Sequence, residues 1–140
     1  MKLHSTAGLV IAILLTGISA AAQQKTQTAA AEASAAQWLA LVDAGNYAAS
    51  WNEAAQLFKT KVSKEQWSQM AESARGPLGK LNSRALKSSA YTTTLPGAPD
   101  GQYVVIQYDS SFEHKKSAVE TVTPMLDKDG QWRVSGYFIR

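Results

Sequence analysis

Apolar residues recur at helical spacing throughout the first half of the chain. A first set, from about Ala29 to Ala44, places an apolar stripe on one face: Ala35, Trp38, Leu39, Leu41 and Val42. A second set follows Gly45, a left-handed stop, and has i, i+3, i+4, i+7 spacing: Trp51, Ala54, Ala55 and Phe58. A third set lies on one helix face: Trp67, Met70, Ala71 and Ala74. These sets predict three helices before residue 79.

The third helix has the clearest start signal in the chain. Ser63 and Gln66 have the spacing of a capping box, in which each side chain bonds the backbone N–H of the other residue. Val62 and Trp67 flank this box as a hydrophobic staple. We expect the helix to end at Gly76-Pro77, where glycine takes a left-handed turn and proline cannot extend the helix.

Past Gly79 the apolar period changes from 3.6 to two residues, as is typical of strands. Four strands are expected, over residues 81–95, 102–112, 117–128 and 131–140, with a two-residue hairpin turn at Asp129-Gly130. Helices that precede an antiparallel meander predict one α+β domain over residues 33–140.

Turns centred on Asp129-Gly130 and on His114-Lys115 predict the register of the sheet. Glu120 then lies opposite Ile139, Met125 lies opposite Val134, and Thr121 lies opposite both Phe138 and Tyr108. The face covered by the helices collects Val104, Ile106, Tyr108, Met125, Trp132, Val134 and Phe138. The outer face is also apolar, with Tyr103, Val105, Val122, Leu126, Tyr137 and Ile139. An apolar outer face predicts a homodimer.

The first residues are typical of a signal peptide. Lys2 and His4 precede an uncharged apolar run over residues 7–18, which is shorter than a membrane span, and small residues follow it. We expect cleavage after Ala20 or Ala22, so that residues 1–22 are removed and residues 23–32 form a polar, alanine-rich tether. The protein is then exported, to the periplasm of a Gram-negative host or to the medium, and does not remain in a membrane.

The composition of the chain excludes several kinds of functional site. A length of 140 residues allows one domain, and 45% apolar residues suffice for a packed core. The absence of cysteine excludes disulfides, thiolate zinc sites and a cysteine nucleophile. A formal charge of +3 gives no support for nucleic-acid binding.

Several segments resemble those of the nuclear transport factor 2-like superfamily, and more narrowly a family of exported bacterial proteins labelled as a domain of unknown function. The resemblance covers residues 33–140 and is carried by Trp38-Leu39, Gly45-Asn46-Tyr47, Trp51, Phe58-Lys59, the segment from Val62-Ser63 to Trp67, Pro77-Leu78-Gly79, Arg84, residues 120–123, residues 129–134 and Gly136-Tyr137. It implies a cone in which a bent four-stranded sheet wraps three helices. It supplies no catalytic residues, although the superfamily includes isomerase-like and dehydratase-like enzymes.

The candidate chemistry is sparse. His114 lies in a polar turn, where a solvated residue is the expected interpretation, and no histidine or carboxylate set has the spacing of a metal site. Asp109 and Glu120 face each other in the predicted register, which would suit acid–base work. Tyr108, Glu120 and Tyr137 are the candidate ligand-binding residues, although the register places Tyr108 on the face opposite the other two. No cofactor is expected.

Three function classes remain open at this level. The first is an exported, non-catalytic module that binds a small molecule or an envelope protein. An isomerase- or dehydratase-like enzyme is the alternative, and a dimerisation or inhibitory module of the cell envelope is a third. A basic cluster of Lys59, Lys61 and Lys64 is interpreted as solvated surface, with an anionic partner as the second interpretation.

Overall fold

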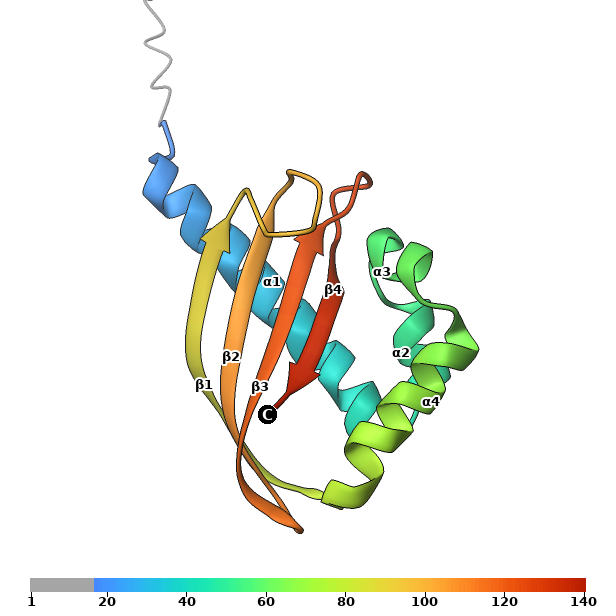
Figure 1. Cartoon of the computed structure of the whole chain (residues 1–140). Coiled ribbons are helices and arrows are strands. Elements are labelled where there is room, and N and C mark those ends of the chain that lie inside the picture. The colour runs from blue at the N-terminus through green and yellow to red at the C-terminus, as the bar shows by residue number, and fades with distance from the viewer. Residues whose placement is uncertain (1–16) are drawn as a thin grey trace, which may run out of the picture.

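The computed structural model describes residues 17–140 (Figure 1). Its elements, in chain order, are α1 (Ala20–Asp43), α2 (Tyr47–Asn52), α3 (Gln56–Lys61), α4 (Lys64–Arg75), the 3₁₀ turn η1 (Gly76–Leu78), β1 (Leu81–Thr92), β2 (Tyr103–Phe112), β3 (Lys115–Leu126) and β4 (Trp132–Ile139). The strands form one antiparallel sheet in the order β1-β2-β3-β4. Helices followed by an antiparallel sheet confirm the predicted α+β class.

The helical half contains four α-helices in the described chain, where three were predicted. The predicted second helix divides into α2 and α3 around Ala54 and Ala55. The backbone N–H of Ala55 leaves the helical ladder and donates to the carbonyl oxygen of Val134 on β4 at 2.8 Å. The two alanines are buried at this contact, so their apolar character reflects packing against the sheet as well as helical periodicity.

The first helix is longer than predicted, because residues 23–32 are helical and do not form a tether. Alanine and glutamine are good helix formers, and this outweighs the polar character of the segment. The segment also contacts the domain, since Ala31 is buried and Gln27 Oε1 accepts from Trp132 Nε1 at 2.8 Å. Most of the expected signal peptide, residues 1–16, lies outside the described residues.

The predicted capping box of α4 is confirmed. Ser63 Oγ accepts from the backbone N–H of Gln66 at 3.1 Å, and Gln66 Oε1 accepts from the N–H of Ser63 at 3.0 Å. The predicted left-handed stop at Gly76 is wrong. Gly76 has φ −52° and continues into η1, and the chain turns instead at Gly79, with φ +71°. A Cβ there would lie 2.9 Å from Glu113 Cβ, so the close approach of the β2–β3 turn requires glycine.

The register of β3 against β4 agrees with the prediction at one end only. Glu120 lies opposite Ile139 and Thr121 lies opposite Phe138, as expected. A shift between Thr123 and Pro124 then moves Met125 opposite Arg133, where Val134 had been predicted. A bulge of this kind inserts an extra residue that turn-counting cannot see.

The register of β2 against β3 differs from the prediction by one residue, because Tyr108 lies opposite Glu120 and not opposite Thr121. The turn is formed by Glu113 and His114, whose backbone N–H groups donate to the carbonyl oxygens of Lys80 and Leu78, both at 2.9 Å. Because side chains alternate between the faces of a strand, this slip exchanges the predicted inner and outer residues of β3 relative to those of β2.

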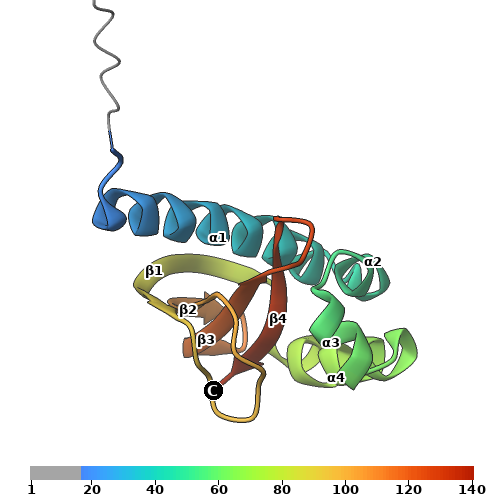
Figure 2. The same ribbon diagram turned by 90° about the horizontal axis from the view of Figure 1, so that it is seen from above.

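The helices cover one face of the sheet, with α1 running across it and α3 and α4 beside β4 (Figure 2). Val122 and Tyr137 point into this interior, contrary to the predicted faces, and Phe138 points outward and is 56% exposed. The predicted apolar outer face is therefore wrong for Val122 and Tyr137. Tyr103 is buried, with its hydroxyl donating to Pro99 O at 2.6 Å.

Aromatic rings form the centre of the core. Trp67 lies 5.6 Å from Trp38 and 5.0 Å from Phe58 between ring centroids, and Tyr137 lies 5.4 Å from Trp38. The indole N–H groups of Trp38 and Trp67 donate to the backbone oxygen and the hydroxyl of Ser50, so these polar groups are satisfied inside the core. Within residues 17–140, none of the helices has the length and apolar character needed to cross a membrane.

Candidate functional site

Glu120 is the most heavily bonded acid of the described chain. Its side chain is fully buried on β3, and three neighbouring elements donate to it. Arg84 Nε and Ser110 Oγ donate to Oε1 at 2.7 and 2.6 Å, and Tyr137 Oη donates to Oε2 at 2.5 Å. A second Arg84 nitrogen bonds Oε2 at 3.1 Å. The carboxylate is therefore held by a bidentate guanidinium and two hydroxyl groups.

A second acid extends this network toward the surface. Asp43, the last residue of α1, accepts from Arg84 at 2.7 and 2.9 Å and from Arg75 at 2.8 Å. Arg75 is only 5% exposed and reaches within 4.0 Å of Glu120. Two carboxylates and two guanidiniums balance in charge, and we call Asp43, Arg75, Arg84, Glu120 and Tyr137 the ion cluster.

The cluster perturbs its titratable members in opposite directions. Burial raises the pKa of the Tyr137 hydroxyl, and the adjacent Glu120 charge raises it further. At Asp43 burial also tends to raise the pKa, but the hydrogen bonds and charges of Arg84 and Arg75 outweigh it, so the pKa of this carboxyl is lowered. Folding thus favours a neutral Tyr137 hydroxyl and an ionised Asp43 carboxylate.

The structure brings the three candidate ligand-binding residues together, against the predicted register. Tyr108 lies opposite Glu120, and all three side chains share the face covered by the helices. Arg84 lies 5.9 Å from the ring of Tyr108, so the tyrosine also contacts the cluster. Sequence analysis missed Asp43, Arg75 and Arg84, because each is a single charge within a helix or strand pattern.

The predicted acid pair does not form. Asp109 lies opposite Val119 and points away from Glu120, with its side chain 63% exposed and 3.8 Å from Lys87. His114 is exposed in the β2–β3 turn, in agreement with a solvated residue. Within residues 17–140, no group of His, Asp and Glu side chains has the arrangement of a metal site.

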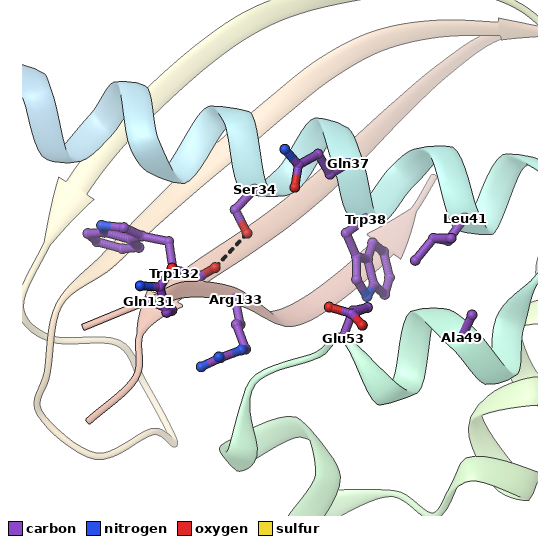
Figure 3. Close-up of a pocket in the computed structure, with 9 residues that line it drawn as sticks. All are labelled: Ser34, Gln37, Trp38, Leu41, Ala49, Glu53, Gln131, Trp132 and Arg133. Atoms are coloured by element: carbon purple, nitrogen blue, oxygen red, sulfur yellow. Dashed lines mark hydrogen bonds between the residues drawn. The ribbon is translucent and has the colours of Figure 1, made fainter. Parts of the chain in front are cut away.

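The surface is hollowed where α1 and α2 meet the start of β4 (Figure 3). This groove has a volume of about 500 Å³. We call it the α1–β4 groove, and its lining residues are Ser34, Gln37, Trp38, Leu41, Ala49, Glu53, Gln131, Trp132 and Arg133. In Figure 3, Ser34 and Gln37 descend from α1, while Glu53 and Arg133 lie across from them.

Some polar groups of the α1–β4 groove are already committed. Ser34 Oγ donates to the carbonyl oxygen of Trp132 at 2.7 Å, which fastens α1 to β4. Arg133 donates to Asp127 at 2.9 Å and to Asp129 at 2.8 and 2.9 Å, and the hydrogen bond from Arg133 lowers the pKa of Asp129 to about 2. The anion-binding capacity of this guanidinium is therefore used within the hairpin.

Other polar side chains of the groove are free to bind a ligand. In the described chain, the side chains of Gln37, Glu53 and Gln131 are exposed and form neither hydrogen bonds nor ion pairs. They offer one carboxylate and two carboxamides to a molecule in the groove. The pattern of apolar residues could not reveal them, because they come from three segments far apart in the chain and carry no shared motif.

A second groove adjoins the first across Arg133. It has about 510 Å³ between α3 and the β3–β4 hairpin and is more apolar, with Leu57, Met125 and Leu126 in its wall. The hairpin that carries Asp127, Asp129 and Arg133 thus stands between two hollows.

Comparison with known proteins gives one family match. The model of a family described as "Protein of unknown function (DUF4019)" matches residues 34–137, which include the ion cluster and every lining residue of both grooves. Among curated proteins, none matches the chain.

Proposed function

The chain belongs to the DUF4019 family of proteins of unknown function, and we propose that it is an exported, non-catalytic module that binds a ligand or a partner in the α1–β4 groove. The observation that carries this proposal is the set of uncommitted polar groups in that groove. Gln37 of α1, Glu53 just after α2 and Gln131 just before β4 line one hollow, while Ser34 and Arg133 beside them are fixed by hydrogen bonds. A rigid wall with a few free polar groups is the usual form of a binding site.

The chemistry of the groove favours a donor-rich ligand. The Glu53 carboxylate accepts hydrogen bonds only, and Arg133 is neutralised by Asp127 and Asp129. An amine, a guanidinium or a hydroxyl-rich group fits this balance better than an anion does. A small molecule of this type, or a segment of an envelope protein with a basic side chain, would occupy the groove.

The interior supports a non-catalytic role. Both oxygens of Glu120 are engaged by donors, and neither Glu120 nor Tyr137 lines the α1–β4 groove or the second groove. An isomerase- or dehydratase-like enzyme would need its acid to border the substrate. In this chain, aromatic rings and ion pairs fill the space between the helices and the sheet.

Two further parts of the proposal rest on sequence. We propose that the helices and sheet form a cone of the nuclear transport factor 2-like type, supported by the helices gathered on one face of the sheet (Figure 2). Export is supported by the short apolar run and the small residues that follow it. Cleavage after Ala20 or Ala22 predicts that the intact mass of the mature protein corresponds to a chain beginning at Ala21 or Gln23.

Site-specific photo-crosslinking in the host tests the binding role. Gln131 is replaced by p-benzoylphenylalanine, and Ser88, exposed on β1, carries the same residue in a control protein. We expect an adduct from position 131 that is absent from position 88 and is lost when Glu53→Ala is added. Native mass spectrometry of the purified protein then detects a small molecule that dissociates on denaturation. Equal adducts at both positions, or adducts indifferent to Glu53→Ala, would contradict the proposal.

A further inference from the structure

Three lysines gather where α3 ends and α4 begins. Lys59 and Lys61 lie in the last turn of α3, and Lys64 is the first residue of α4. The ammonium groups of Lys59 and Lys64 lie 5.4 and 5.3 Å from the centroid of the half-buried Trp51 ring. Cation–π attraction to this one ring keeps the two charges close together.

The charge of this region is not neutralised internally. In the part of the chain that the structure describes, none of the three lysines forms an ion pair, whereas Arg75, Arg84 and Arg133 are each paired with carboxylates. Residues 54–71 contain these three lysines and one acid, Glu65, which gives a local charge of +2. The amino-terminal end of α4 adds a positive partial charge in the same place.

Apolar groups lie directly beside the lysines. Met70 is 61% exposed and lines a shallow hollow of about 470 Å³ together with Lys61 and Val62. The hollow is joined to the tryptophan, because Trp51 Nε1 donates to the carbonyl oxygen of Val62 at 2.8 Å. Lys59, Lys61, Lys64, Trp51, Val62 and Met70 thus form one continuous surface, which we call the lysine patch.

The composition of the patch identifies the kind of partner that it fits. Lysine ammonium groups are compact, hydrated charges on flexible stems, suited to a diffuse layer of phosphates. Recognition of defined carboxylates usually relies on the planar guanidinium of arginine, and the patch contains none. An exposed methionine among lysines adds an apolar side chain that can enter the boundary between headgroups and acyl chains.

We propose that the lysine patch docks the protein on an anionic phospholipid surface. The patch lies on α3, α4 and the segment between them, with Trp51 contributed by α2, whereas the α1–β4 groove is lined by residues of α1, by Ala49 and Glu53 of the α2 region and by the start of β4. The two surfaces share no residue, so this inference does not depend on the proposed ligand. Docking through the patch would hold the module at a membrane with its groove unoccupied by lipid.

Co-sedimentation with vesicles tests the proposal. Vesicles contain phosphatidylcholine alone or phosphatidylcholine mixed with phosphatidylglycerol, and all proteins share one amino terminus, checked by intact mass. The patch variant is Lys59→Ala/Lys61→Ala/Lys64→Ala. The control variant, Lys80→Ala/Lys115→Ala/Lys116→Ala, removes the same charge beside the β2–β3 turn, outside the lysine patch.

We expect wild type and the control variant to bind the anionic vesicles and to bind the neutral ones far less. Each patch lysine should contribute roughly fivefold to the partition coefficient, so the patch variant should lose about 100-fold. Met70→Ser should weaken binding with all charges retained. Thermal unfolding verifies that the variants remain folded.

Three results of the vesicle assay would each overturn the inference. They are no preference of wild type for anionic vesicles, equal losses in the two triple variants, and undiminished binding of the patch variant. Binding to polyglutamate without binding to vesicles would assign the lysine patch to an acidic protein and also overturn it. Glu53→Ala should leave vesicle binding unchanged, which separates this test from that of the groove.

Discussion

Replacing Glu120 with glutamine perturbs the ion cluster while nearly preserving its shape. The variant leaves two guanidiniums facing one carboxylate, that of Asp43, and the new amide cannot accept from all of the hydroxyl and guanidinium donors. Removing one partner of a buried ion pair costs about 3–5 kcal/mol, because the remaining charge stays desolvated. Glu120 is fully buried, so we expect Glu120→Gln to lower the free energy of unfolding by this amount.

Urea denaturation followed by tryptophan fluorescence measures this loss. With a urea dependence of about 2 kcal/mol per molar, the midpoint should fall by roughly 2 M. The control is Asp109→Asn, whose carboxylate is 63% exposed and 3.8 Å from Lys87, and which should change stability by less than about 0.5 kcal/mol.

A double variant separates charge from packing. Glu120→Leu with Arg84→Met removes one charge of each sign and leaves Asp43 paired with Arg75. It should be more stable than Glu120→Gln, because replacement of a whole buried pair by apolar groups is often neutral. A Glu120→Gln protein as stable as Asp109→Asn would refute the reasoning, since the cluster would then tolerate an unbalanced charge.

Three other perturbations follow from the structure. Folding raises the pKa of Tyr137, so the stability gained from its neutral hydroxyl is complete below the pKa of an unfolded tyrosine, near 10, and is lost as the pH rises above that value. Tyr137→Phe should therefore lose less stability than wild type between pH 8 and pH 11 in urea titrations. Ser63→Ala removes half of the capping box and should cost about 1 kcal/mol in thermal unfolding. Gly79→Ala should cost more than Gly97→Ala, because both glycines have positive φ but only the first has a neighbouring atom within 3.0 Å of the added Cβ; equal melting temperatures would contradict this.

Local signals predicted the elements of the fold well. The capping box at Ser63 depends on interactions between residues that are close in sequence, and the structure contains it. A hairpin also joins β3 to β4 near Asp129-Gly130, but the predicted two-residue turn is wrong, because the N–H of Asp127 donates to the carbonyl oxygen of Gln131 and three residues form the turn. The division of the second helix was not predictable, because it depends on a hydrogen bond from Ala55 to Val134, which is distant in the chain. The helical conformation of residues 23–32 is consistent with their helix propensity, because alanine and glutamine are good helix formers.

The faces of the sheet required information that the strand pattern lacks. Both faces of β2 and of β3 carry apolar residues, such as Val104 and Val105 on β2 and Val119 and Val122 on β3, so alternation alone did not choose between two registers one residue apart. The position of the turn at Glu113 and His114 depends on the backbone of Leu78 and Lys80. A register based on turn residues alone therefore separated Tyr108 from Glu120, although the two lie opposite each other.

The candidate site was predictable only in part. Glu120 and Tyr137 were predicted as candidate ligand-binding residues, and in the structure the Tyr137 hydroxyl donates a hydrogen bond to Glu120. Their charged partners come from α1, α4 and β1, and only the tertiary fold places these elements together. The groove residues are ordinary surface glutamines and a glutamate, whose shared location is a property of packing.

The last strand closes the domain onto the first helix. Trp132 receives a hydrogen bond from Ser34, 98 residues earlier, and donates one to Gln27, 105 residues earlier. The sheet itself assembles from strands adjacent in sequence, but contacts of this separation form late because a long loop must close first. A chain that ends before β4 therefore lacks both of these hydrogen bonds to α1. If the proposed export carries the chain through a membrane unfolded, the domain completes its fold only after its carboxyl-terminal strand has crossed.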